Sequence, residues 1–149
     1  MINRKSQAAL EFIMTYGWAI LVVLVAIGAL AYFGVLSPDK FLPSRCTLQS
    51  GIACLDFTVV STGASTGDIT VVLQNSVGFD LTGVSIDIQT CPTASAPISL
   101  SNGEKAAPVT LTGCTVQGAK YSGYINVTYT TTDSGLTHHN IGDITARVG

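Results

Sequence analysis

The chain divides into two parts that differ in how hydrophobic and polar positions are arranged. Residues 12–36 form a run of 25 positions without a charged side chain. Beyond this run, short hydrophobic segments alternate with polar positions. A long uninterrupted apolar run predicts a helix, whereas alternation with a period of two predicts strands that each bury one face. We therefore expect an α+β chain, in which a single long apolar N-terminal α-helix is followed by an all-β head.

The strands expected in the head are short, rich in Val, Ile, Thr and Tyr, and separated by Gly, Asn, Asp and Pro. The expected strands are residues 55–61, 68–74, 84–89, 97–100, 109–112, 121–130 and 141–148. Alternation is clearest over residues 84–88 and 124–129. Short strands at this spacing indicate an immunoglobulin-like sandwich.

The apolar run is long enough to cross a membrane. At about 1.5 Å per residue it spans about 37 Å as a helix, compared with roughly 30 Å for a bilayer core. The apolar part of a secretory signal is only about 7–15 residues long and ends at a small-residue cleavage site. No such site follows this run closely. The helix is therefore expected to remain in the mature protein.

The four cysteines all follow the apolar run, at positions 46, 54, 91 and 114. None is spaced as in a C-x-x-C motif, so the sequence gives little support for zinc or thioredoxin-like chemistry. An even number of cysteines behind a membrane segment favours disulfides in an oxidising compartment, and hence a head outside the cell. Four cysteines allow three pairings. Loop closure costs least for Cys46–Cys54 and Cys91–Cys114, while four reduced core cysteines are the alternative.

The residues before the apolar run form a compound motif. Arg4 and Lys5 are followed by Ser6, then by Gln7, and then by Glu11 at the edge of the run. This segment resembles the leader of archaeal type IV pilins, which carry a class III signal peptide. In that family a prepilin peptidase cuts just before the Gln, and the fifth residue of the mature chain is Glu. A cut between Ser6 and Gln7 makes Glu11 that fifth residue.

The resemblance covers residues 4–36 and implies a division of the chain. Residues 1–6 would be the leader, 7–36 the transmembrane and filament-core helix, 37–45 a linker, and 46–149 the β-sandwich head. The resemblance implies that the helix polymerises with copies of itself and that Glu11 pairs with the new α-amino group on Gln7 of a neighbouring subunit. A charge pair in an apolar core sets register more than it adds stability. The partners implied are the prepilin peptidase, the pilus assembly machinery and, before assembly, the membrane.

Composition excludes some other classes of function. Charged residues make up 11% of the chain, and the net charge is −2. Beyond residue 37 there are five basic and eight acidic residues, and no basic cluster supports nucleic-acid binding. P-loop and G-x-G-x-x-G motifs are absent. We expect a protein that is not an enzyme, with no catalytic residues, cofactor or metal.

Two features of the head raise specific questions. Asn126 begins the one N-x-S/T sequon, and we expect it on the polar face of a strand because Ile125 and Val127 should face the other way. Whether it is glycosylated stays open. His138 and His139 are expected in a solvated turn after Gly135. Adjacent strand residues face opposite sides, so this pair is a poor metal site.

Two functions are compatible with these patterns. The first is a structural subunit, major or minor, of an extracellular archaeal pilus-like filament used for adhesion or surface attachment. Its precursor would lie in the membrane before assembly. The second is an uncleaved, single-span, membrane-anchored immunoglobulin-like binding ectodomain. An archaellin is a third reading, which fits the Gln7 and Glu11 pattern less well. What the head binds is not encoded in any motif.

Overall fold

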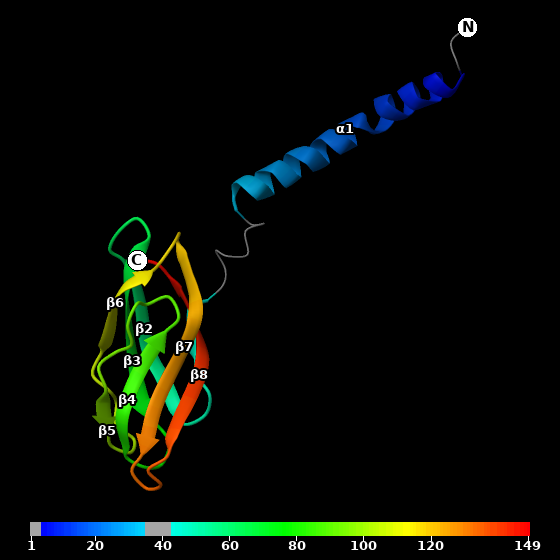
Figure 1. Cartoon of the computed structure of the whole chain (residues 1–149). Coiled ribbons are helices and arrows are strands. Elements are labelled where there is room, and N and C mark those ends of the chain that lie inside the picture. The colour runs from blue at the N-terminus through cyan, green and yellow to red at the C-terminus, as the bar shows by residue number, and fades with distance from the viewer. Residues whose placement is uncertain (1–3, 35–42) are drawn as a thin grey trace. The chain divides into compact units, whose positions relative to one another are not determined.

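The structure is a computed structural model that describes residues 4–34 and 43–149. It falls into two compact units, residues 1–42 and 43–149, which we describe separately. The expected fold class is confirmed: one N-terminal helix precedes an all-β antiparallel sandwich of two sheets (Figure 1). Most of the expected linker, residues 37–45, lies outside the described residues.

The helix α1 extends over Arg4–Tyr32. It starts three residues before the expected boundary at Gln7, and its last turn ends before Leu36. Gly34 has a φ of 70° and its N–H donates to the carbonyl of Ala31. Glycine adopts this left-handed conformation at little cost and commonly ends helices. Gly34 therefore provides a stop signal for the helix in its own sequence.

The head contains eight strands in the described residues. They are β1 (Arg45–Thr47), β2 (Ile52–Ser61), β3 (Thr66–Asn75), β4 (Leu81–Ile88), β5 (Ile98–Leu100), β6 (Val109–Thr115), β7 (Lys120–Thr131) and β8 (Thr137–Arg147). Seven of them overlap the expected strands. The strand β1 was missed and lies at the end of the expected linker. Because it is only three residues long, it carries no visible alternation and is defined by its pairing with β8.

The two sheets have the strand orders β1-β8-β7-β4-β5 and β2-β3-β6. Neighbouring strands pair antiparallel throughout both sheets. With β2, β3 and β6 taken as strands A, B and E, and β4, β7 and β8 as C, F and G, the order is that of an immunoglobulin-like sandwich. The expected architecture of the head is thus confirmed at the level of topology.

A bulge extends β4 beyond its expected start at Val84. The register against β5 shifts between Leu81 and Val84, the register against β7 shifts between Thr82 and Ser85, and Gly83 has a φ of 61°. A glycine in this conformation lets one extra residue fit into a strand without ending it. The sequence reading took this glycine as a break, whereas the strand continues through it.

The core lies between the inner faces of the two sheets. Its fully buried side chains include Ile69 and Leu73 on β3, Ile86 on β4, and Ile125 on β7. One polar side chain, Asn75, is also fully buried. Its Nδ2 donates to the carbonyls of Phe79, Leu100 and Ser101, and its Oδ1 accepts from the N–H of Val77. Because all these groups are paired, Asn75 fixes one end of the sandwich without leaving an unsatisfied polar atom.

Candidate functional site

The surface of α1 is the most unusual feature of the chain. The helix is 29 residues long, and none of its residues is buried within the chain. Trp18, for example, is 70% exposed. Within the described residues α1 is the one helix long and apolar enough to cross a membrane. An apolar surface of this size must be covered by lipid or by other protein.

Glu11 is the one acidic residue in α1. Its side chain is exposed, and within the described residues its carboxylate has no hydrogen bond or ion pair, while its backbone carbonyl accepts a hydrogen bond of 2.8 Å from Thr15 Oγ1. Ser6 and Gln7 are also exposed and lie in the first two turns of the helix. Apart from Glu11, the charged residues of α1 are Arg4 and Lys5, so a cut before Gln7 would leave Glu11 as its one charged side chain.

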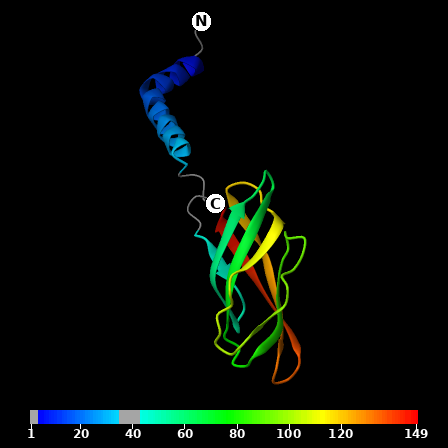
Figure 2. The same cartoon turned by 90° about the vertical axis from the view of Figure 1, so that its left-hand side faces the viewer.

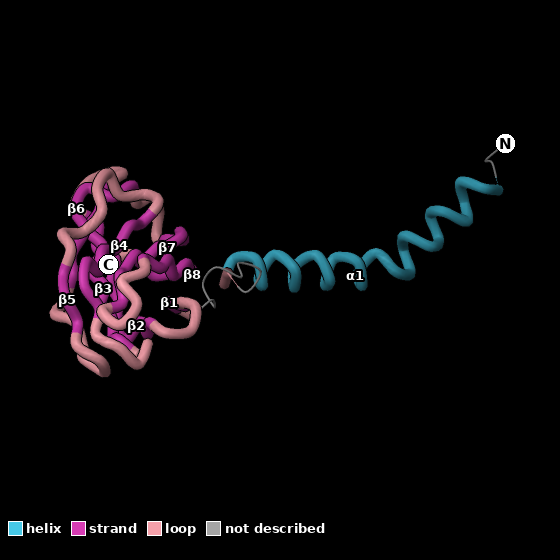
Figure 3. The backbone as a smooth tube through the Cα atoms, turned by 60° about the horizontal axis from the view of Figure 1, so that its bottom comes forward, coloured by secondary structure: helices cyan, strands magenta, loops and turns pink. Residues whose placement is uncertain are grey.

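The axis of α1 is bent (Figures 2 and 3). A Thr hydroxyl that bonds the carbonyl one turn back tends to bend a helix, and a glycine in the interior weakens it. Thr15 makes such a bond, and Gly17 follows two residues later. The helix carries an apolar groove of about 460 Å³. Its lining residues are Phe12, Tyr16, Ala19, Ile20, Val23 and Leu24. Their spacing places them on one helix face, a signal that the sequence reading overlooked.

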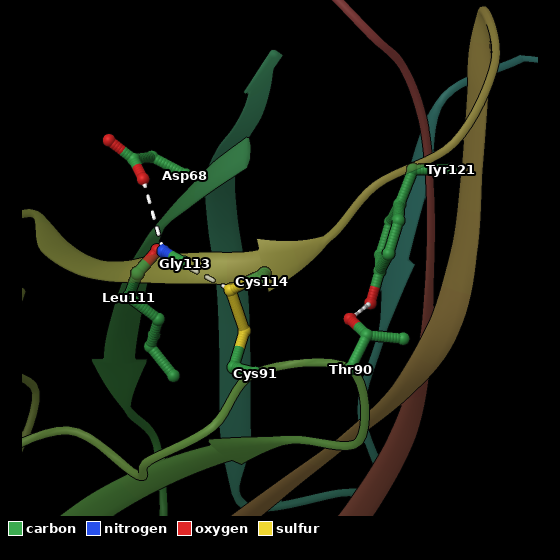
Figure 4. Close-up of a disulfide and its surroundings, with 7 residues drawn as sticks. All are labelled: Asp68, Thr90, Cys91, Leu111, Gly113, Cys114 and Tyr121. Atoms are coloured by element: carbon green, nitrogen blue, oxygen red, sulfur yellow. Dashed lines mark hydrogen bonds between the residues drawn. A yellow bond between two sulfur atoms is a disulfide. The ribbon is translucent and has the colours of Figure 1, made fainter. Parts of the chain in front are cut away.

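The cysteines form two disulfides, Cys46–Cys54 and Cys91–Cys114, the pairing that loop closure favoured. Each disulfide connects the two sheets of the sandwich. Cys46 lies on β1 and Cys54 on β2, whereas Cys91 follows β4 and Cys114 lies on β6. Figure 4 shows the second disulfide beside Tyr121, whose hydroxyl is 2.6 Å from Thr90 Oγ1. An apolar N-terminal helix is typical of membrane insertion or of a signal sequence, and disulfides are typical of an extracellular domain.

Asn126 lies in β7, the middle strand of the five-stranded sheet. Ile125 and Val127 are fully buried, so Asn126 faces outward as expected. It is half-buried between Asp87 of β4 and Ile141 of β8, and its Oδ1 atom is buried without a hydrogen-bond partner. A glycan attached here would project from the outer face of the sheet. Glycosylation of Asn126 stays a prediction.

His138 and His139 do not lie in a turn, so that expectation is wrong. Both belong to β8, which begins at Thr137, four residues before the expected strand. Polar residues at the start of this strand concealed it in the sequence pattern. The ring of His138 stacks on Tyr129, and His139 Nδ1 is 3.0 Å from Thr128 Oγ1. In the part of the chain that the structure describes, no group of three or more His, Cys, Asp or Glu side chains could hold a metal ion.

The outer face of the five-stranded sheet also has a shallow polar pocket of about 330 Å³. Its lining residues are Arg45, Gln89, Ser122, Gly123, Tyr124, Asp143 and Thr145. The sequence reading missed this pocket because its residues come from β1, β7, β8 and the end of β4. These residues are brought together by the register of the paired strands and do not form a motif in the sequence.

Comparisons with known proteins identify no family. No family model matches the chain, and no curated protein matches it either. A solved structure described as the apo PCuAC domain from PmoF1 is similar over 70% of this chain and 98% of that chain, with 10% sequence identity and a TM-score of 0.47. A likeness this distant carries no inference about function, which therefore has to be argued from the helix and the head themselves.

Proposed function

We propose that the chain is the precursor of a structural subunit of an extracellular filament similar to archaeal type IV pili. In this account a membrane peptidase removes residues 1–6, and α1 moves from the bilayer into a core built of identical helices. The head remains outside and forms the filament surface. The filament serves in adhesion or surface attachment.

The observation that carries the proposal is the charge pattern of α1 around Glu11. A lone carboxylate on an otherwise uncharged helix is costly in an apolar surrounding unless it is paired. Cleavage before Gln7 would remove Arg4 and Lys5 and create one new cation, the α-amino group of Gln7. That amino group on a neighbouring helix would be a partner for Glu11. The pair would fix the axial register between subunits.

The packing surface of α1 supports the same account. A single-span anchor surrounded by lipid needs an apolar surface but no particular pattern of ridges and grooves. A helix that packs against several others gains from close-packed contacts, which need complementary ridges and grooves. The groove lined by Phe12 and Tyr16 is one such surface feature, and it begins one residue after Glu11. The head needs no contact with α1 to complete its core, because its buried residues all come from β1–β8 and their connections.

Replacement of Glu11 tests this function directly. We expect Glu11→Gln, which keeps the shape of the side chain but removes its charge, to reduce filament yield by at least about tenfold, a loss that corresponds to roughly 1.4 kcal/mol. Filaments would be counted by electron microscopy of cells. Membrane fractionation and the protease resistance of the head would show that the chain is still inserted and folded.

The matched control is Thr15→Ala, one helical turn away. It removes the hydrogen bond to the Glu11 carbonyl without changing any charge, so filaments should form at a yield within about threefold of the natural chain. Normal filaments from Glu11→Gln cells would contradict the charge-pair mechanism. Equal loss in both variants would point to helix shape rather than charge.

A membrane-anchored ectodomain is the second candidate. The observation that favours it is the self-contained head behind a single helix that could span a bilayer. In that case residues 1–6 would be retained, Glu11 would lie at the depth of the lipid headgroups, and substitution there would change neither the location nor the amount of the protein.

A further inference from the structure

The polar pocket on the head arises from the register of three neighbouring strands. Arg45 of β1, Thr145 of β8 and Ser122 of β7 lie in one row across the sheet. In the next row Tyr124 lies opposite Asp143. Gln89 completes the lining from the end of β4, where its N–H donates to the Tyr124 carbonyl at 3.2 Å. The pocket therefore rests on paired backbone rather than on a loop.

Tyr124 is the one aromatic side chain in the lining, and it is 61% exposed. An aromatic ring offers a flat apolar face, while the phenol hydroxyl can donate and accept hydrogen bonds. A single exposed aromatic side chain is ordinary on a protein surface, so the significance of Tyr124 lies in the hydrogen-bonding side chains that line the pocket beside it. The ring thus marks a surface suited to a ligand with one apolar face.

The side chains around the ring supply both kinds of hydrogen-bonding group. Arg45 carries donors, the Asp143 carboxylate carries acceptors, and the Gln89 amide carries both. Within the described residues neither the Arg45 guanidinium nor the Asp143 carboxylate is paired with another protein group. Because the one cation and the one anion balance, the lining has no net charge and favours a neutral ligand.

We propose that this pocket binds a neutral saccharide. A pyranose ring has a face of C–H groups that stacks on an aromatic ring and an edge of hydroxyls that donate and accept hydrogen bonds. The pocket, at about 330 Å³, is near the lower end of small-molecule sites and so fits one or two sugar units. An acidic sugar would meet the Asp143 carboxylate.

The experiment is a binding assay with the full chain, held in lipid nanodiscs and produced in a host that does not glycosylate Asn126. The probes are immobilised oligosaccharides of neutral hexoses and N-acetylhexosamines, with uronic-acid oligosaccharides beside them. We expect binding to at least one neutral probe. Tyr124→Ala should weaken that binding by about tenfold or more, whereas Tyr124→Phe, which keeps the ring, should stay within about threefold.

The control variant is Phe79→Ala, which removes an aromatic side chain that is similarly exposed on the head but lies outside the pocket. It should bind as the natural chain does. The proposal is overturned by an absence of binding to every neutral probe, by binding to acidic probes alone, or by equal binding of Tyr124→Ala and the natural chain. Filament formation is not needed for this assay, so its result does not depend on the proposed function.

Discussion

Tyr121 is a side chain at which packing and ionisation are linked. It lies on the inner face of β7 and is almost completely buried. Burial raises the pKa of its phenol, and the hydrogen bond with Thr90 offsets part of that increase. Gly123 is required beside it, because a Cβ there would overlap the Tyr121 hydroxyl. The neutral phenol is therefore the form that the folded head accommodates.

This residue predicts a loss of stability at alkaline pH. A raised pKa means that the folded state holds the phenol proton more tightly than the unfolded chain does. The contribution of Tyr121 to the free energy of unfolding is therefore complete below the unfolded pKa of about 10 and is lost as pH rises through the folded pKa. We expect the urea midpoint of the natural chain to fall between about pH 9 and 11 more steeply than that of Tyr121→Phe. Parallel curves for the two chains would show that Tyr121 is not responsible.

At the scale of elements, each of the two disulfides joins one sheet of the sandwich to the other. Cys46–Cys54 closes a separation of 8 residues, and Cys91–Cys114 closes one of 23. In the chain-entropy model the longer loop restricts the unfolded chain more. The Cys46–Cys54 disulfide also ties the three-residue strand β1 to β2, so it keeps this short edge strand in place against β8.

Removal of each disulfide should therefore have a different effect. Replacement of Cys46 and Cys54 by Ala should lower the free energy of unfolding by about 2.5 kcal/mol, and replacement of Cys91 and Cys114 by about 3.4 kcal/mol, if loop entropy dominates. Urea unfolding of the full chain in detergent would measure both values. A larger loss from the Cys46 and Cys54 pair would mean that packing of β1, rather than loop entropy, governs the effect.

The elements that sequence could predict are those whose signal is local. Alternation located seven strands, and it placed Ile125 and Val127 on the inner face because neighbouring residues reveal a period of two. The strand β1 has three residues, too few for a period. The start of β8 was hidden by His138 and His139, which are polar on a strand end that packs little. The pairing of β1 with β8 is non-local, whereas the start of β8 is defined by its hairpin pairing with β7.

The candidate sites divide in the same way. The sequon at Asn126 and the motif around Glu11 are contiguous in sequence, so they could be identified without coordinates. The pocket around Tyr124 could not be identified in this way, because strand register places Arg45 in the same row as Ser122 although the two are far apart in the chain. The groove on α1 falls between these cases, since helical spacing places its lining residues on one face but its volume requires the coordinates.

At the scale of the whole molecule, one unit is complete alone and the other is not. The head has its own buried core and two disulfides. The helix has no buried residue, and its length of 29 residues corresponds to about 43 Å. A chain built in this way must place α1 in lipid, in an assembly of other helices, or in each in turn. The proposed filament subunit uses both in succession.

The measurement that tests this account most directly is the N-terminal sequence and intact mass of the protein sheared from native cells. The account predicts a chain that begins at Gln7, with a mass lower by four hydrogens than that of the reduced chain because both disulfides are formed. A chain that begins at Met1 and is recovered only with detergent would contradict the filament subunit and support the membrane-anchored ectodomain.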